Sequence, residues 1–480
     1  MYHKKSEKGQ ALVLIAFAAV GLFAFTALSV DGGRVFSDRR HAQNAADTAA
    51  LAAALARVRA QSDPDGAAVA SGEARALSNG YPNDPASTVE VKICDDPSLN
   101  LSIDCQGLPG NAVLSDYIQV KITSYVRTTF ARIIGWKQVK NIVTAVAKAK
   151  LGGPSPVFDG SALVALAPDG DYTIRNQGNV NLDINNSGVF NNSGTACAFG
   201  AGGNSYINAD TGFALVTNPP CNTLNGPNDH GNVVDTGMYS SGTQLAYPPD
   251  LDIPDPTINC PVGVNGSVTL DDPVNRIYTV HPGNFPGYNF SSPGDYTFLP
   301  GSYCFSGSLS IGGTAHVTAN YVDIKITSGD FSVTSNLNCD YILVHIAGGS
   351  GIRVTGNSNV VCTNATFFAS TGSVSLEGNG ANTYTAPTAG PHSEYANLLV
   401  YMPYGNTEAL KITGNSLTEM TGSIIGVSAP VTLHGTSNFE INSSITGYTI
   451  EITGAARTTI NYVPDDQFQV LDPSALGLTK

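Results

Sequence analysis

The sequence contains few charged side chains and none of the short motifs that mark the commonest enzyme classes. Asp, Glu, Lys and Arg make up 13% of the 480 residues, and there is a single tryptophan. No Walker, dinucleotide-binding or G-x-S-x-G motif occurs, so nucleotide and serine-esterase chemistry lack their usual residues. Low charge together with 51 glycines favours many turns and short strands over long charged helices. We expect two or three units, one of them rich in β-structure.

Basic residues become scarce after Lys150. Up to that residue there are 17 Lys and Arg against 13 Asp and Glu, whereas the remainder holds 7 against 25. A surface so poor in cations cannot neutralise phosphates, so nucleic acid is excluded as a partner.

The cysteines lack metal-ligand spacing, because no C-x-x-C pair occurs. Their even number favours disulfides in an oxidising compartment over a zinc site. Neighbours such as Cys94 with Cys105, or Cys339 with Cys362, are candidate pairs, but the sequence does not fix the connectivity, and free thiols in a reducing cytoplasm remain an alternative. The eight cysteines are Cys94, Cys105, Cys197, Cys221, Cys260, Cys304, Cys339 and Cys362.

Only one stretch is apolar enough to cross a membrane. No charge occurs from Gln10 to Val30, and residues 11–30 at about 1.5 Å per residue span a hydrocarbon core of roughly 30 Å. The basic flank before it resembles that of a signal sequence, but no small-x-small cleavage site follows, so we expect a single-pass anchor. Three basic residues on each side leave the orientation open, and the cysteines favour placing the bulk of the chain outside the cytoplasm.

An alanine-rich stretch follows the anchor and favours a helix that continues it as one rod. Leu51, Leu55 and Val58 fall at helical spacing and predict a narrow apolar stripe. Asp31 and Arg34 are spaced to pair on one helix face near the lipid headgroups.

At these residues the chain resembles the N-terminal segment of the Flp/Tad tight-adherence pilus-assembly family, the TadE/TadG-like proteins. The family pattern has a Gly before an apolar helix, an Ala/Val-Asp-x-Gly-Arg element and a Gln-Asn-Ala-Ala-Asp run, and about fifty residues match it. The resemblance implies a membrane-anchored envelope protein with protein partners in a pilus or related secretion assembly. The matching residues are Gly9, Gln10, Asp31, Gly33, Arg34, Gln43, Asn44 and Asp47.

Two departures from related patterns limit what the resemblance implies. Pseudopilins are cut after a Gly and carry Glu at the fifth mature position, but cleavage after Gly9 would place Leu14 there. Some TadG-like proteins carry a von Willebrand A domain, whereas the nearest stretch here, Asp159 to Leu163, lacks the second serine of its metal motif. We therefore predict no metal site.

The next segment, residues 61–150, predicts a small α+β domain of pilin-like outline. Alternating apolar and polar residues predict strands at 88–94, 116–126 and 139–150, with a short helix between the last two.

A five-residue pattern, apolar-x-apolar-x-Gly or a close variant of it, recurs seven times after residue 300. The copies start at Leu309, Phe331, Ile352, Val374, Leu410, Val431 and Ile450. A repeat near twenty residues indicates a solenoid, and β-branched residues with Gly and Asn corners favour a right-handed parallel β-helix over a leucine-rich repeat. The first and third residues of each copy should point into the core.

These patterns give the expected fold: an N-terminal transmembrane and extended helix with a small α+β pilin-like domain, then a mainly-β right-handed parallel β-helix resembling pectate-lyase-like solenoids. Stretches near residues 179 and 206 read as degenerate rungs, and most of 218–300 has no assignable pattern. The expected domains are 1–60 (anchor and Ala-rich helix), 61–150 (α+β), 151–300 (Asn/Pro/Gly-rich) and 301–480 (β-helix with a C-terminal cap after Ile460).

An enzyme of the polysaccharide-active β-helix type would need carboxylates clustered on one outward column. The two readable columns hold at most one each, and Glu377 with Lys411 reads as a surface pair. His316, His345 and His434 lack ligand spacing. We therefore expect a structural or adhesive envelope protein, without catalytic residues or cofactor, that contacts a surface glycan or other copies of itself. A membrane-tethered polysaccharide enzyme and a minor pseudopilin cut after Gly9 remain alternatives.

Overall fold

The computed structural model describes residues 10–60, 62–109, 112–195, 197–203, 205–216, 232–233, 239–355, 359–377, 380–454, 457–472 and 474–479. Two compact units are present: unit 1 comprises Met1–Pro154 and Leu471–Lys480, and unit 2 comprises Ser155–Val470. The expected domain limit between residues 300 and 301 lies inside unit 2 and is not a boundary between the two units. Gly9 and Cys221 lie outside the described residues.

Unit 1 is organised around one long helix, α1 (Gln10–Arg59), which runs uninterrupted through Gly32 and Gly33. The described side chains before Asp31 are mostly exposed, whereas beyond it one face of the helix is buried. That face consists of alanines, not of the expected leucine stripe: Leu55 is 39% exposed, and Leu51 is only half-buried. Small side chains let the helix approach the sheet closely. The buried alanines are Ala42, Ala45, Ala46, Ala49, Ala50, Ala53 and Ala54.

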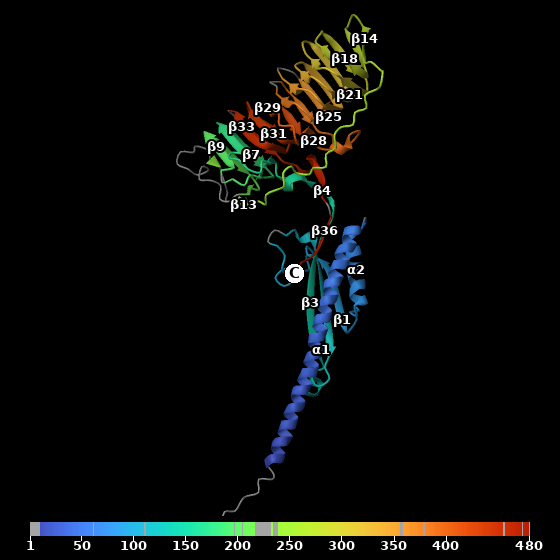
Figure 1. Cartoon of the computed structure of the whole chain (residues 1–480), viewed down its shortest axis with the longest axis vertical. Helices are drawn as coiled ribbons and strands as arrows, with labels where there is room; N and C mark the ends of the chain where they lie inside the picture. Colours follow the sequence, from blue (N-terminus) through green and yellow to red (C-terminus); the bar gives the residue numbers. More distant parts are fainter. Residues whose placement is uncertain are drawn as a thin grey trace, which may run out of the picture. The chain divides into compact units, whose positions relative to one another are not determined.

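The helix packs on a four-stranded antiparallel sheet in the order β1-β2-β3-β36 (Figure 1). The three strands and the short helix expected from the sequence are confirmed, and a second helix, α2, is added against α1. The elements of unit 1 are α2 (Pro64–Ser78), β1 (Ser87–Ile93), η1 (Leu114–Asp116), β2 (Tyr117–Arg127), η2 (Ala131–Ile134), β3 (Gln138–Lys150) and β36 (Ala475–Thr479).

The fourth strand of this sheet comes from the C-terminus of the chain. In β36, Leu476 lies opposite Ala149 and Leu478 lies opposite Ala147, so both leucines share the face of the sheet that carries α1. The end of the chain therefore belongs to unit 1. In chain order, the whole of unit 2 is inserted between β3 and β36. The connecting strands β4 (Gly153–Pro156) and β35 (Gln469–Asp472) pair with each other.

Unit 2 is a parallel β-solenoid of about 12 turns. Its strands stack in three parallel ladders (Figure 1). Ladder 1 contains β17 (Tyr288–Phe290), β20 (Leu309–Ile311), β22 (Asp330–Val333), β24 (Gly351–Val354), β26 (Ser373–Leu376), β29 (Leu410–Gly414), β31 (Ser423–Gly435), β33 (Ile445–Gly454), β6 (Ile174–Gly178) and β9 (Phe199–Gly203).

Ladder 2 shares β31 and β33 with ladder 1, and ladders 2 and 3 share three other long strands. Ladder 2 contains β16 (Gly283–Phe285), β19 (Gly301–Phe305), β21 (Ala315–Ile326), β23 (Asn336–Ile346), β25 (Val360–Ala369), β28 (Leu398–Met402), β31, β33, β5 (Leu163–Ala165), β8 (Val189–Asn191), β11 (Phe213–Leu215) and β13 (Tyr239–Ser241). Ladder 3 contains β15 (Ile277–His281), β18 (Gly294–Phe298), β21, β23, β25, β27 (Thr383–Thr385), β30 (Glu419–Thr421), β32 (Phe439–Ile441), β34 (Arg457–Asn461), β7 (Asn181–Asn185), β10 (Tyr206–Ala209) and β12 (Asn232–Val233).

The seven sequence repeats are successive strands of ladder 1. The first residue of each copy lies opposite the first residue of the next, from Leu309 and Phe331 onward to Ile450. The first and third residues of every copy are at most 2% exposed, so the expected inward orientation is confirmed. They form one continuous apolar core, because a parallel ladder stacks like positions directly on one another.

The order of the rungs in space differs from their order in the chain. β33 is followed not by a cap but by β5 and β6, so residues 163–215 extend the stack beyond the last repeat. The expected rungs near residues 179 and 206 are confirmed as β7 and β10.

The chain then returns along the outside of the solenoid to its other end. This return segment, residues 242–266, touches Ser428 through Tyr247, Tyr395 through Pro254 and β19 through the Cys260–Cys304 disulfide. It covers an outer apolar layer that includes Leu343 and Phe368.

At that far end, β14 (Ser267–Asp272) pairs antiparallel with β15 and covers the edge of the first rung. Much of the stretch that had no readable pattern, residues 218–300, is therefore the return segment and the first rungs.

Candidate functional site

The apolar part of α1 ends at a buried carboxylate that binds a loop of the sheet. Asp31 is 6% exposed, and its carboxylate oxygens accept hydrogen bonds from the backbone N–H groups of Thr129, Phe130 and Ala131, at 2.8, 2.9 and 2.7 Å. These bonds, with that from Ala131 foremost, lower the pKa of Asp31, and the nearby Arg34 adds to the effect. The ionised carboxylate therefore fixes the loop between β2 and β3 to the helix.

Arg34 adds a second link to the same loop. Its Nη1 donates a 2.7 Å hydrogen bond to Oγ1 of Thr129, although the side chain itself is exposed. Asp31 and Arg34, which were expected to pair with each other, thus mainly form hydrogen bonds to the same loop. Apart from its own helix backbone and its chain neighbours, Gly33 has no described atom within 4 Å of where a Cβ would stand, so packing among the described residues gives no reason for a glycine there.

Further along α1, the Gln-Asn-Ala-Ala-Asp run joins the helix to the sheet. Nε2 of Gln43 donates to Oδ1 of Asp47 at 2.8 Å and to the carbonyl oxygen of Thr144 in β3 at 3.1 Å. Asn44 is exposed, and its carbonyl oxygen accepts a hydrogen bond from Thr48. Gln10 begins the helix. The structure thus shows Asp31, Arg34, Gln43 and Asp47 joining the helix to the sheet and its loop or to one another.

The comparison with protein families bears on this same segment. Residues 9–74 match the Flp pilus-assembly TadE/G-like family model. The matched residues include all of α1 and most of α2, so the TadE/G-like segment consists of the long apolar helix and the helix that packs against it. Searches of curated proteins and of solved structures found no match to the chain. The match is therefore confined to the helical part of unit 1, and the solenoid has to be interpreted from its own residues.

Two residues that sequence reasoning missed secure the TadE/G-like segment. Oδ2 of Asp38 accepts a 2.8 Å hydrogen bond from Nδ2 of Asn141, and its other oxygen accepts one from the hydroxyl of Tyr81. Burial, followed by the charge of Asp38, raises the pKa of Tyr81. Both contacts join residues far apart in the sequence, so no local pattern could have revealed them.

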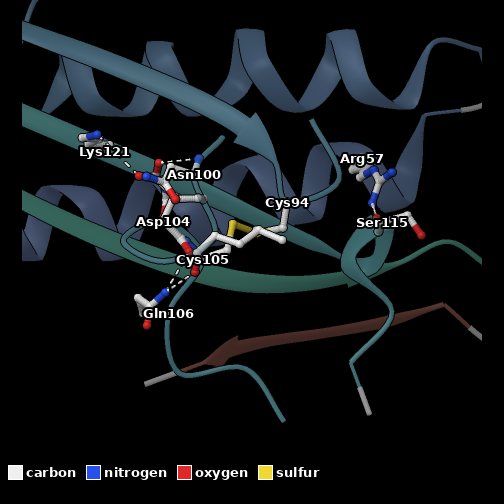
Figure 2. Close-up of a disulfide and its surroundings, with 10 residues drawn as sticks. Arg57, Cys94, Asn100, Asp104, Cys105, Gln106, Ser115 and Lys121 are labelled. Atoms are coloured by element: carbon white, nitrogen blue, oxygen red, sulfur yellow. Dashed lines mark hydrogen bonds and ion pairs between the residues drawn. A yellow bond between two sulfur atoms is a disulfide. The ribbon is translucent and has the colours of Figure 1, made fainter. Parts of the chain in front are cut away.

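Arg57 is the second of these residues, and Figure 2 shows it beside Ser115. It is 5% exposed. Its Nε donates to Oδ1 of Asp65 at 2.7 Å, and its Nη1 donates to the carbonyl oxygens of Ser115 and Ala149. One guanidinium thus joins α1 to α2, η1 and β3. Its loss would leave buried carbonyl groups unsatisfied.

Three disulfides join described residues, and two of them are the expected neighbours. Cys94–Cys105 closes the loop between β1 and η1 (Figure 2). Beside it, Asp104 accepts hydrogen bonds from Gln119, Asn100 and Lys121, and that from Gln119 contributes most to its lowered pKa. The other two disulfides are Cys339–Cys362 and Cys260–Cys304, and Cys197 is also disulfide-bonded.

Each solenoid disulfide fastens a different part of unit 2. Cys339 lies opposite Cys362 on adjacent rungs, so that bond joins two turns inside the core. Cys260–Cys304 fastens the return segment to ladder 2.

The outward face of ladder 1 is a polar surface on which charges are paired. Nζ of Lys411 lies 2.8 Å from Oε2 of Glu377, which confirms the expected surface pair. Glu451 lies opposite Arg175 on the next rung. A face of this kind carries hydroxyl and amide groups for weak contacts but no group of carboxylates.

A groove on ladder 3, which the sequence did not resolve, holds two carboxylates. It has a volume of about 590 Å³ and is lined by Glu419 and Glu440 among Ser, Thr and Asn side chains. Thr421 and Asn442 bridge adjacent rungs, so the two glutamates lie on neighbouring turns, both exposed. No group of three or more His, Cys, Asp or Glu side chains suited to a metal occurs among the residues that the structure describes.

A histidine and a serine meet beside another groove, of about 540 Å³, that Ser370 lines. Nε2 of His345 lies 3.0 Å from Oγ of Ser370, and burial lowers the pKa of His345 to about 4. Nδ1 of His345 has no hydrogen-bond partner among the described residues, so the pair lacks the third group that orients the ring in a catalytic triad.

A pH-sensitive contact holds the long loop between β27 and β28. Nε2 of His392 lies 2.8 Å from Oδ1 of Asp323 in β21, and Nδ1 lies 3.6 Å from Oε1 of Glu394 in η5 (Ser393–Tyr395). The hydrogen bond to Asp323, more than any other cause, raises the pKa of His392.

We predict that this loop loosens as the pH rises. A raised folded-state pKa contributes stability that is complete below the unfolded value of about 6.5 and is lost as the pH passes the folded value. Proteolytic cleavage within residues 386–397 should therefore accelerate between slightly acidic and mildly alkaline pH. In the variant His392→Gln, this loop should be cleaved at the same rate across the whole pH range. The exposed histidine variant His316→Gln should keep the native profile, and a flat profile in the native chain would contradict the prediction.

Proposed function

We propose that this chain is a membrane-anchored envelope protein that displays its β-solenoid outside the cytoplasm, as a structural or adhesive part of a Tad-type pilus or surface system. The TadE/G-like match supports the pilus context, and the apolar first part of α1 supports the anchor. Among the described residues, α1 is the one helix long and apolar enough to cross a membrane.

The observation that carries this proposal is the insertion of the solenoid into the anchored unit. Unit 1 is completed by β36, so the chain leaves unit 1 after β3 and must return to it. A solenoid connected at both ends stays attached to the anchor even if one connection is cut. Such a double connection suits a part that bears load, as in adhesion or assembly.

The location outside the cytoplasm is supported by the disulfides. Disulfides persist in oxidising compartments and are rare in the cytosol. The cross-rung Cys339–Cys362 bond and the Cys260–Cys304 bond both lie in the solenoid, which points to its exposure to the oxidising side.

The non-catalytic role is supported by the surface of the solenoid. Ladder 1 presents Ser and Thr side chains and paired charges. A long polar face of repeated side chains suits many weak contacts with a surface glycan or with copies of the same chain.

The test is fractionation of intact cells with an antibody against the solenoid. We expect a full-length signal in washed membranes that is lost when intact cells are treated with protease. A signal that resists protease in intact cells but not in lysed cells would place the solenoid in a closed compartment and end the adhesive proposal. A signal in sheared filaments, with the mature N-terminus at Gln10, would instead make the chain a processed pilus subunit.

One specific observation, the groove on ladder 3, favours the alternative that this chain is a polysaccharide-active enzyme. Glu419 and Glu440 line a polar groove from adjacent turns, as a polysaccharide-active β-helix would require. Polysaccharide cleavage by the purified chain that is abolished in Glu419→Gln, with folding intact, would replace the proposed role by a catalytic one.

A further inference from the structure

The loop between β2 and β3, residues 128–137, exposes large apolar side chains to solvent. Ile133 is 84% exposed, Trp136 is 68% exposed and Phe130 is 40% exposed. Trp136 is the only tryptophan in the chain. Exposed apolar side chains gathered on one short loop are unusual on a soluble surface and mark a contact site.

The loop is fixed in this conformation by its own hydrogen bonds. The N–H of Trp136 donates to the carbonyl oxygen of Ala131 at 3.0 Å, and that of Thr128 donates to Lys137 at 3.2 Å. Gly135 ends η2 with φ of 98°, a conformation that a glycine adopts at little cost. The apolar side chains are therefore held outward and cannot fold back at low cost.

Asp31 places the loop at the end of the apolar part of α1. Its carboxylate binds three consecutive N–H groups of the loop, and the residue before it, Val30, is the last of the uncharged span. One residue of helix corresponds to about 1.5 Å along its axis. Figure 1 shows the β2–β3 hairpin ending beside α1, where the helix leaves the sheet. If α1 crosses a bilayer, the loop therefore meets the surface of that bilayer.

The charges around the loop match an anionic surface. Arg34, Arg132 and Lys137 are exposed, and the sequence from Tyr117 to Lys150 contains no Asp or Glu. Lipid headgroup regions favour Trp at the boundary with the acyl chains and Arg or Lys beside anionic phosphates.

We propose that the β2–β3 loop is a second membrane contact, which inserts Ile133, Trp136 and Phe130 into the headgroup region of the bilayer that α1 crosses. Arg132 and Lys137 bind anionic lipid headgroups there. This contact would fix the tilt and rotation of unit 1 relative to the membrane, because a single helix leaves both free. The inference relies on α1 as the anchor but not on the compartment or role proposed above.

The single tryptophan makes the test direct. Full-length protein is reconstituted at low density into phosphatidylcholine vesicles with or without phosphatidylglycerol, and the fluorescence of Trp136 is measured. We expect strong quenching by lipids brominated near the headgroup end of the acyl chain and weak quenching by lipids brominated near the chain terminus. The quenching should increase with phosphatidylglycerol.

Two variants separate the loop from the anchor. Ile133→Ser should lose most of the quenching, whereas Val113→Ser, an equally simple change of an exposed residue beyond the opposite end of β2, should keep it. Vesicles that float with bound protein but leave Trp136 unquenched would overturn the inference while leaving the anchor intact. A second copy of the chain could cover the loop instead of the bilayer. In that case Trp136 would show no lipid quenching at low protein density and would become shielded from solvent only as the density rises. This outcome would also overturn the inference. Protein that fails to float would refute the anchor itself and the inference with it.

Discussion

The substitution Phe331→Ala is expected to lower the free energy of unfolding of the solenoid by about 3–5 kcal/mol, the usual cost of truncating a buried phenylalanine. Phe331 is 1% exposed and starts the second copy of the repeat, between Leu309 and Ile352 in ladder 1. Adjacent rungs hold the backbone in place, so the cavity cannot close by collapse. Urea-dependent proteolysis of the full-length protein in detergent, with fragments assigned to unit 2, measures the loss.

The neighbouring residue supplies the control. Ser332 lies on the outward side of the same strand, so Ser332→Ala should change stability by about 0.5 kcal/mol or less. Equal effects of the two substitutions would show that the strand does not have the orientation described here.

Removal of residues 474–480 is expected to destabilise unit 1 although the deleted segment lies at the far end of the sequence. The five-residue strand β36 pairs along β3 from Lys150 to Val146. At a net ~0.5–1.5 kcal/mol per hydrogen bond, its loss should cost ~2–4 kcal/mol. The backbone groups of β3 that face β36 would become an unpaired edge. Hydrogen exchange of the β3 amides should therefore accelerate in the truncated chain, while exchange in ladder 1 stays unchanged.

A double substitution separates the strand from its side chains. Leu476→Thr with Leu478→Thr keeps the backbone ladder and removes two half-exposed leucines, so it should have a smaller effect than the deletion. Unchanged exchange in β3 after the deletion would show that β36 does not complete the sheet.

Local sequence patterns predicted the structure correctly wherever the pattern of one segment alone decides its conformation and its buried face. The alternation of apolar and polar residues predicted β1, β2 and β3, and the repeat predicted which side chains of ladder 1 face inward. The pairing of Glu377 with Lys411 also followed from the repeat, because both side chains point outward from adjacent rungs of the same parallel ladder. The disulfides Cys94–Cys105 and Cys339–Cys362 were candidates because each joins cysteines that are neighbours in the sequence, and the structure contains both.

The same patterns failed where the contact partners are remote. Leucines at helical spacing suggested the buried face of α1, but the alanines occupy it, because close packing against a sheet favours small side chains over larger apolar ones. Asp31 was expected to pair with its helix neighbour, yet its main partners lie about a hundred residues further along the chain. Arg57 carried no recognisable motif, since its role depends on carbonyl groups supplied by η1 and β3.

By itself, the sequence determined the membrane-length apolar helix, the TadE/G-like segment, the strands β1, β2 and β3 of unit 1 and the inward stacking of the solenoid repeats. These features depend on composition and on periods of two, 3.6 or about twenty residues, which are local properties. Only the tertiary structure decided that rungs from residues 163–215 follow the last repeat, that residues 242–266 run back along the solenoid and that β36 completes the sheet of unit 1. An open strand edge accepts any strand of suitable pattern, so the choice among partners is made by chain connectivity and by packing of the whole unit.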